Sequence, residues 1–193
     1  MLDEILDVVS DDDMVIGQES RFLVHQNGLQ HRGVHVFLVT PDSRLLVQRR
    51  GKHKEAYPLA LDCSISEHVK AGEDYFQAAE RGLQEELGIG DAQIQALVKF
   101  RMVYGPNDYE ICILYEGKLD TERIYFDPLE VEGITYHTLA ELDALIEHGE
   151  VALSSWFVEL IRWYGDKRSG LDIIETFPHE HLLFRTDHLK SHR

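Results

Sequence analysis

The chain has 193 residues, of which 44% are hydrophobic and 28% charged, a balance typical of a globular domain that excludes wholesale disorder. Asp and Glu number 35 against 19 Lys and Arg, so the formal net charge is −16. A chain this acidic is a poor partner for nucleic acid or for an anionic membrane surface. It could bind an anion only through a local group of cations or through bound metal ions.

The two cysteines, Cys63 and Cys112, are too few for a disulfide framework and fit a reducing compartment. The first residues lack the basic and apolar regions of a secretory signal. No apolar segment approaches the ~20 residues that a membrane helix requires. We therefore expect a cytoplasmic protein that does not enter a membrane.

The first elements in chain order are strands, which we expect at residues 4–9, 14–17, 33–40 and 44–49, followed by one extended segment over 59–69. Apolar residues at three- and four-residue steps then predict a helix over 74–87, which Gly88 would end. Two further strands should cover 94–103 and 109–119, on either side of a turn at 105–107.

Two helices complete the predicted elements, at 139–148 and at 155–164, the second capped by Ser154 or Ser155. Strands that mostly precede helices, with hairpins among them, predict an α+β fold with a mixed sheet flanked by helices. We expect one domain over 1–165 and a C-terminal extension over 166–193 that could pack on it. The helix at 155–164 could pack on its own domain or on a second copy in a homodimer.

Carboxylates gather on one face of the predicted helix over 74–87. Gly82 and Glu86 lie four residues apart and share a face, and Glu85 lies beside them. Hard cations such as Mg²⁺ take oxygen ligands of this kind, usually with substrate phosphates in the same shell. The alternative is a solvated acidic helix face, which is what charge runs usually are.

A basic cluster follows the strand at 44–49 in this otherwise acidic chain. Its members are Arg49, Arg50, Lys52 and Lys54. Arginine and lysine together can bind a diphosphate, Arg through its planar fork and Lys as a point charge. The alternative is a solubilising loop.

Seven residues of the helical segment share a long, spaced pattern: Glu73, Arg81, Leu83, Glu85, Glu86, Gly88 and Ile89. This pattern resembles the Nudix box, and the resemblance extends over roughly residues 1–150. It implies the Nudix fold, an α/β/α sandwich with a mixed sheet. It also implies attack on a diphosphate linkage with the help of Mg²⁺ or Mn²⁺. Glu73 would pair with Arg81 and orient the loop against the helix.

Two positions depart from the Nudix box. Glu67 stands where the family has Gly, and Gly82 stands where many members have a Glu that is a metal ligand or general base. We expect Glu67 to project into the space above Gly82 and to return a carboxylate to the metal site. The alternative is drift at an inactive site, with Glu67 pointing to solvent.

Within the family, the chain looks closest to the branch that contains isopentenyl diphosphate isomerase. The resemblance assigns to a second metal site the residues His25, His31, His68, Asp108 and Glu110. Imidazole with carboxylate suits Mn²⁺ or Zn²⁺, although a single histidine is more often structural than a ligand. Arg50 and Lys54 match the diphosphate-binding positions of the branch.

Ser66 argues against the isomerase hypothesis, because it occupies the position of the branch's catalytic cysteine. A serine cannot supply a thiolate-like base near neutral pH. Cys63 lies three residues earlier, and on a continuous strand this odd offset would point it to the opposite face. We therefore expect Cys63 to be a small buried residue. We also expect Trp156 and Trp163, seven residues apart, to form a core stripe.

Three functions remain open. The leading hypothesis is a Nudix hydrolase that cleaves a small-molecule diphosphate, such as a nucleoside diphosphate derivative. Glu85 and Glu86 would hold Mg²⁺ or Mn²⁺, and Glu67 and Glu86 would be catalytic. The second is an isomerase-like enzyme for a prenyl diphosphate, with Glu110 as the catalytic carboxylate. The third is a non-catalytic ligand-binding protein that lost its base at Gly82.

Overall fold

The computed structural model describes residues 4–119 and 124–178. Its elements, in chain order, are β1 (Ile5–Val9), β2 (Val15–Ser20), α1 (Arg21–Asn27), β3 (His31–Val39), β4 (Leu45–Arg50), β5 (Leu61–Asp62), β6 (Ile65–His68), α2 (Tyr75–Leu87), β7 (Ile94–Gly105), β8 (Asp108–Lys118), β9 (Val131–His137), α3 (Leu139–His148), α4 (Ser155–Tyr164) and β10 (Asp172–Thr176). The end of the predicted extension, residues 179–193, lies outside the described residues.

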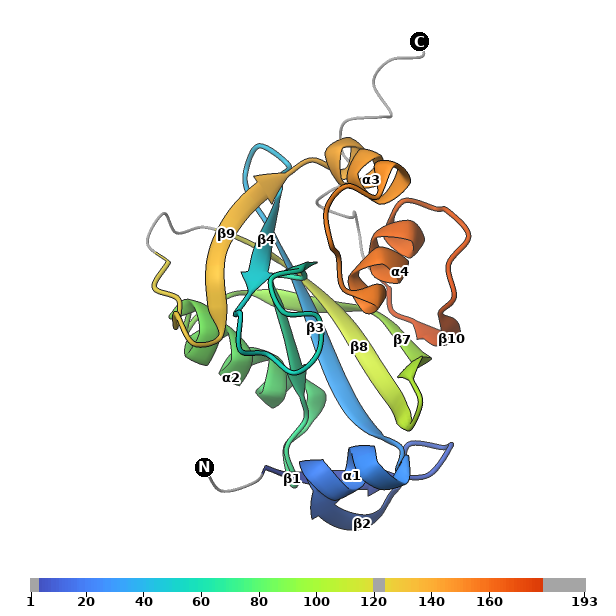
Figure 1. Ribbon diagram of the computed structural model, residues 1–193. Helices are drawn as coiled ribbons and strands as arrows, with labels where there is room; N and C mark the ends of the chain where they lie inside the picture. The colour runs from blue at the N-terminus through green and yellow to red at the C-terminus, as the bar shows by residue number, and fades with distance from the viewer. Residues whose placement is uncertain (1–3, 120–123, 179–193) are drawn as a thin grey trace.

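The fold is a mixed sheet between two layers of helix. The large sheet has the order β10-β7-β8-β3-β4-β5, with β6 also paired to β3 and β9 to β4. β3 and β8 run parallel and the other pairs are antiparallel. In Figure 1, α2 lies on one side of this sheet and α3 and α4 lie on the other, which confirms the predicted α/β/α sandwich.

Side chains of β3 fill the core on both faces, as the alternation of a buried strand requires. Val34, Val36 and Leu38 pack with α2 in one buried cluster. Phe37 and Val39 pack with α4 in the other. None of the helices among the described residues is long and apolar enough to cross a membrane.

The sheet opens beside β3, and this opening positions the site. β3 pairs with β4 only at Val39 and Leu45, after which β6 takes the place beside β3. At the divergence, the buried Ser64 hydroxyl accepts from the Leu38 N–H at 2.8 Å and donates to the Leu46 carbonyl at 2.7 Å. One side chain thus satisfies a backbone group on each of the two separating strands.

The segment over 59–69 is not the single extended strand that the sequence predicted. It forms β5 and β6, separated by a bend at residues 63–64. Three elements had no prediction: α1, β9 and β10. α1 has only seven residues, capped by Ser20 and ended by Gly28 in the left-handed conformation at φ 63°. β10, within the predicted extension, pairs with β7.

The packing of α2 predicts a large loss of stability on truncating its buried face. Leu83 is 1% exposed, so Leu83→Ala should lower the free energy of unfolding by about 2–5 kcal/mol. Its neighbour Gln84 is exposed, and Gln84→Ala should change this free energy by less than about 0.5 kcal/mol. Urea unfolding measures both variants, and equal effects would contradict the described orientation of α2.

Candidate functional site

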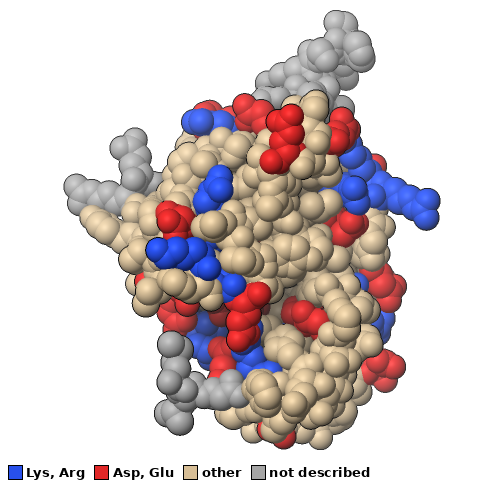
Figure 2. Space-filling view, viewed as in Figure 1, with Lys and Arg blue, Asp and Glu red and all other residues tan. Residues whose placement is uncertain are grey.

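A cavity of about 1140 Å³ opens where β3, β6, β8, α1, α2 and α4 meet. Its lining contains most of the predicted site residues: His25, Arg50, Lys54, Glu67, His68, Glu85, Glu86, Asp108 and Glu110. His31 is fully buried and contacts Glu110. Figure 2 shows acidic and basic side chains crowded together around a hollow on this side of the molecule.

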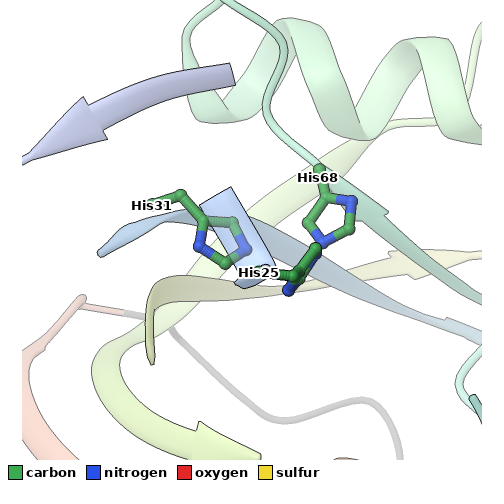
Figure 3. Close-up of side chains that lie close together, drawn as sticks. All are labelled: His25, His31 and His68. Carbon is green, nitrogen blue, oxygen red and sulfur yellow. The ribbon is translucent and has the colours of Figure 1, made fainter. Parts of the chain in front are cut away.

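Three histidines from separate elements converge in space (Figure 3), and two of them, His25 and His68, line the cavity. His25 comes from α1, His31 from β3 and His68 from β6. Their ring centroids lie 4.9, 5.1 and 5.2 Å apart. One ligand atom of each lies within 4.8 Å of the others, close enough for a single ion to reach all three.

Two carboxylates face the histidine cluster. The Oε1 atom of Glu110 lies 3.5 Å from Nε2 of His31 and 3.7 Å from Nε2 of His68. Oδ1 of Asp108 lies 3.4 Å from Nδ1 of His25. Four buried side-chain atoms have no hydrogen-bond partner among the described residues, and three of them belong to this cluster: Nε2 of His25, Nε2 of His31 and Oδ1 of Asp108. Buried polar atoms rarely lack partners, and a cation would supply one, so the residues fit a metal.

Surrounding contacts orient these imidazoles. Nδ1 of His31 lies 3.0 Å from the Leu29 carbonyl, which can only accept, so Nδ1 carries a proton and Nε2 is the ring nitrogen that faces Glu110. Nδ1 of His68 lies 3.7 Å from the Glu4 carboxylate. Burial lowers the pKa of His68, but contacts with Glu110 and Glu4 outweigh it and raise the pKa to about 9.

A second group of carboxylates lies on α2 and β6. Glu86 is 2% exposed and accepts a hydrogen bond from Nε2 of Gln48 at 3.1 Å. Burial raises its pKa well above the ordinary value, and the nearby Glu67 carboxylate raises it further. Nζ of Lys54 lies 4.0 Å away and opposes this shift. Two carboxylates this close favour either a shared proton or a bound cation.

Glu67 occupies the space that the missing side chain of Gly82 leaves. A Cβ atom at Gly82 would lie 2.9 Å from Cγ of Glu67 and 2.8 Å from Cδ1 of Ile65. Nη1 of Arg81 donates to Glu67 at 3.1 Å and to Glu85 at 3.2 Å. The Glu85 side chain is 56% exposed, so it is more solvated than Glu86.

The predicted pairing of Arg81 with Glu73 is present. Nε of Arg81 donates to Oε1 of Glu73 at 2.9 Å, and the Lys70 N–H donates to the same carboxylate at 3.0 Å. Because Lys70 belongs to the loop after β6, this carboxylate ties the loop to α2.

The phosphate-binding candidates Arg50 and Lys54 line the same cavity as His25 and His68. Nη1 of Arg50 donates to Asp62 at 2.6 Å, and its Nε donates to the Ala56 carbonyl at 3.1 Å. The guanidinium carbon lies 5.2 Å from the centre of the Trp156 ring. Lys54 pairs with Glu130 and faces Glu86.

The expectation that Cys63 faces away from Ser66 is wrong. Nδ1 of His35 lies 3.0 Å from Oγ of Ser66 and 4.0 Å from Sγ of Cys63. The bend between β5 and β6 interrupts the strand, so side-chain alternation does not extend from one residue to the other. Cys63 is fully buried, as predicted, and burial raises the pKa of its thiol well above the ordinary value.

Sequence reasoning also missed an aromatic wall of the cavity. Trp156 was expected only in the core, yet it lines the cavity and donates from Nε1 to Asp62 at 2.6 Å. Tyr104 lines it too, and its hydroxyl lies 3.0 Å from Nε2 of His35. Burial lowers the pKa of His35, which keeps this imidazole neutral. No spacing in the sequence joins these residues, because the wall unites β3, β7 and α4.

The family model described as the NUDIX domain matches residues 29–157. The chain belongs to the Nudix family. It is 32% identical over 165 residues to an uncharacterised Nudix hydrolase of Nostoc sp., covering 83% of this chain and 95% of the relative. An isopentenyl-diphosphate Delta-isomerase of Serratia proteamaculans is 30% identical over 168 residues, 85% of this chain and 93% of the isomerase.

The Nudix fold is equally clear from a solved structure. DR0079 from Deinococcus radiodurans superposes with a TM-score of 0.70 at 30% identity, covering 83% of this chain and 98% of that protein. Relatives therefore include proteins named as Nudix hydrolases and proteins named as isomerases, as the sequence resemblance predicted.

Metal binding at the histidine cluster should release a proton at neutral pH. The pKa of His68 is about 9, above its ordinary value of 6.5, so its imidazole is charged at pH 7 and must lose a proton to bind a metal. Calorimetric titration with Zn²⁺ in buffers of different ionisation enthalpy should give about one proton per ion. His68→Ala should remove this release and His53→Ala should keep it. Heats that do not depend on the buffer would contradict the assignment.

Proposed function

We propose that this Nudix protein is a metal-dependent hydrolase that cleaves a diphosphate linkage, with a nucleoside diphosphate derivative as its substrate. The observation that carries the proposal is the pairing of Glu67 with the buried Glu86 across Gly82. In this proposal, the Glu67 carboxylate from β6 takes the role of the one that the box lacks on α2.

The carboxylates and the basic residues of the cavity have different roles in this proposal. Glu67, Glu85 and Glu86 are the oxygen ligands suited to Mg²⁺ or Mn²⁺. When bound, such an ion lowers the pKa of a water molecule and offsets phosphate charge. Arg50 and Lys54 would bind the phosphates, since both line the same cavity as these carboxylates. Glu67 is 18% exposed at its side chain, accessible enough to take a proton from the attacking water.

The histidine cluster is proposed as a second metal site, for Mn²⁺ or Zn²⁺. Its ligands would be His25, His31, His68, Asp108 and Glu110, and the partnerless buried atoms support this assignment. The two clusters share one cavity, so an ion at the histidines would also offset substrate charge. Both cysteines are free and buried, which fits a cytoplasmic, reducing environment.

An isomerase acting on a prenyl diphosphate is the second candidate, because the same cluster includes Glu110 and an isomerase is among the relatives. Ser66 argues against it. The serine lies where a thiol would be required, and Cys63 is fully buried with a raised thiol pKa. A third outcome, ligand binding without turnover, would follow if Glu67 does not replace the missing base.

The test is a panel of diphosphate compounds assayed with Mg²⁺, Mn²⁺ and Zn²⁺ in turn. It should include nucleoside diphosphate sugars, dinucleoside polyphosphates and isopentenyl diphosphate. Release of phosphate-bearing products from a nucleotide compound supports the hydrolase. A shifted double bond in an intact diphosphate identifies the isomerase, and binding without any product identifies a sensor.

Glu86→Gln should lower turnover by roughly 100-fold or more while leaving the protein folded. The pKa of Glu86 is raised, so holding it ionised at neutral pH opposes folding, and Gln should leave the melting temperature unchanged or higher. Glu80→Gln, an exposed carboxylate on the same helix, is the matched control. If Glu86→Gln keeps wild-type turnover and Mg²⁺ dependence, the proposal that α2 supplies the catalytic metal ligand is refuted.

Glu67 and Gly82 should be exchangeable as a pair. Glu67→Gln should abolish turnover without unfolding the chain. Gly82→Glu alone should destabilise it, because its Cβ would press on Glu67 and Ile65. Glu67→Gly combined with Gly82→Glu should recover part of the activity, since one carboxylate again occupies the space. Full activity of Glu67→Gln would show that the exchange is an accident of sequence.

A further inference from the structure

Asp62 is a fully buried carboxylate at the end of β5 that collects hydrogen bonds from several elements. Its Oδ2 atom accepts from Nη1 of Arg50 at 2.6 Å. Its Oδ1 atom accepts from Nε1 of Trp156 at 2.6 Å, the Cys63 N–H at 2.8 Å, Oγ of Ser154 at 2.9 Å and Oγ of Ser66 at 3.3 Å. A buried carboxylate requires such compensation, and here it is supplied in full.

The donors come from elements that are distant in the sequence. Arg50 ends β4, Ser66 belongs to β6, and Ser154 and Trp156 begin α4. Backbone bonds reinforce the junction, from the Leu61 N–H to the Ala152 carbonyl at 2.9 Å and from the Ser154 N–H to the Leu61 carbonyl at 3.0 Å. One carboxylate therefore joins the sheet, the cavity wall and the start of α4.

We propose that Asp62 is the positioning residue that presents Arg50 to a diphosphate ligand. The inference rests on the phosphate-binding role proposed above for Arg50. The bonds from Nη1 and Nε, together with the Trp156 ring, fix the guanidinium in one place before any ligand enters. The N–H donors that these bonds do not use remain for a ligand in the cavity that Arg50 lines. A fixed guanidinium loses less conformational freedom on binding than a mobile one.

Electrostatics alone predicts the opposite effect of Asp62. A negative charge 2.6 Å from the guanidinium weakens its attraction for a diphosphate, so removing that charge should tighten binding. Positioning predicts weaker binding, because a guanidinium without its partner loses its fixed orientation. The sign of the change in affinity therefore separates the two roles.

The experiment is calorimetric titration with inorganic diphosphate in the presence of Mg²⁺. Asp62→Asn preserves the shape of the side chain but removes its charge, and it should weaken binding by about tenfold or more. Ser154→Ala removes a bond to the same carboxylate without touching Arg50, and it should change the affinity by less than about twofold. Unchanged or tighter binding by folded Asp62→Asn would overturn the proposal.

A measurement on the wild-type chain covers the case in which Asp62→Asn does not fold. The indole N–H of Trp156, assigned from its loss in Trp156→Phe, should exchange with solvent more slowly than that of Trp163. It should also remain protected when diphosphate binds. The proposal that Asp62 and Trp156 hold the Arg50 guanidinium in place would be overturned if the Trp156 indole exchanged as fast as that of Trp163. Loss of its protection when diphosphate binds would overturn it as well.

This binding test is independent of turnover. If no compound is hydrolysed yet Asp62→Asn weakens diphosphate binding, the hydrolase proposal fails and the positioning role stands. If the wild type binds diphosphate and Asp62→Asn binds it equally, only the positioning role fails. If the wild type binds no diphosphate, the role of Arg50 fails and this inference fails with it.

Discussion

The register of β3 between β6 and β8 is the constraint on which the site depends. Parallel pairing with β8 sets His31 opposite Glu110, and antiparallel pairing with β6 sets Gly33 opposite His68. A Cβ atom at Gly33 would collide with the Glu110 carboxylate, so only glycine leaves room for it. A slip by one residue would turn every one of these side chains to the other face. The same register places His35 opposite Ser66.

The buried acids of the cavity are stabilised in different ways. Asp62 is fully compensated by its donors, and Glu110 has a pKa held well below its ordinary value because His31 and His68 outweigh the effect of burial. Glu86 has the opposite shift, since burial and Glu67 both disfavour its charge. In a chain with a net charge of −16, Glu67 and Glu86 keep a raised pKa at Glu86 even with Arg81 and Lys54 nearby, so an added cation gains most there. This contrast supports the placement of Mg²⁺ or Mn²⁺ beside Glu86 and not beside Asp62.

Periodicity and spacing were enough to predict α2 and its end at Gly88, because both rest on local pattern, whereas the α/β/α sandwich came from the resemblance to the Nudix family. The box also located the contact of Arg81 with Glu73. The convergence of the histidines was predicted from family resemblance, since no local sequence pattern joins His25 to His68. The bend at residues 63–64 escaped prediction because Ser64 is held by two strands, a tertiary effect. The approach of Trp156 to Asp62 escaped it for the same reason, because α4 packs on the sheet from a distant part of the sequence.

Anomalous X-ray diffraction from crystals grown with Mn²⁺ tests the central claim most directly, because it locates metal without reference to activity. The account predicts one peak at ~2.0–2.3 Å from imidazole nitrogens of His25, His31 and His68. It predicts a second peak beside the carboxylates of Glu67 and Glu86. Manganese bound only to exposed carboxylates outside the cavity, with neither cluster occupied, would contradict the account.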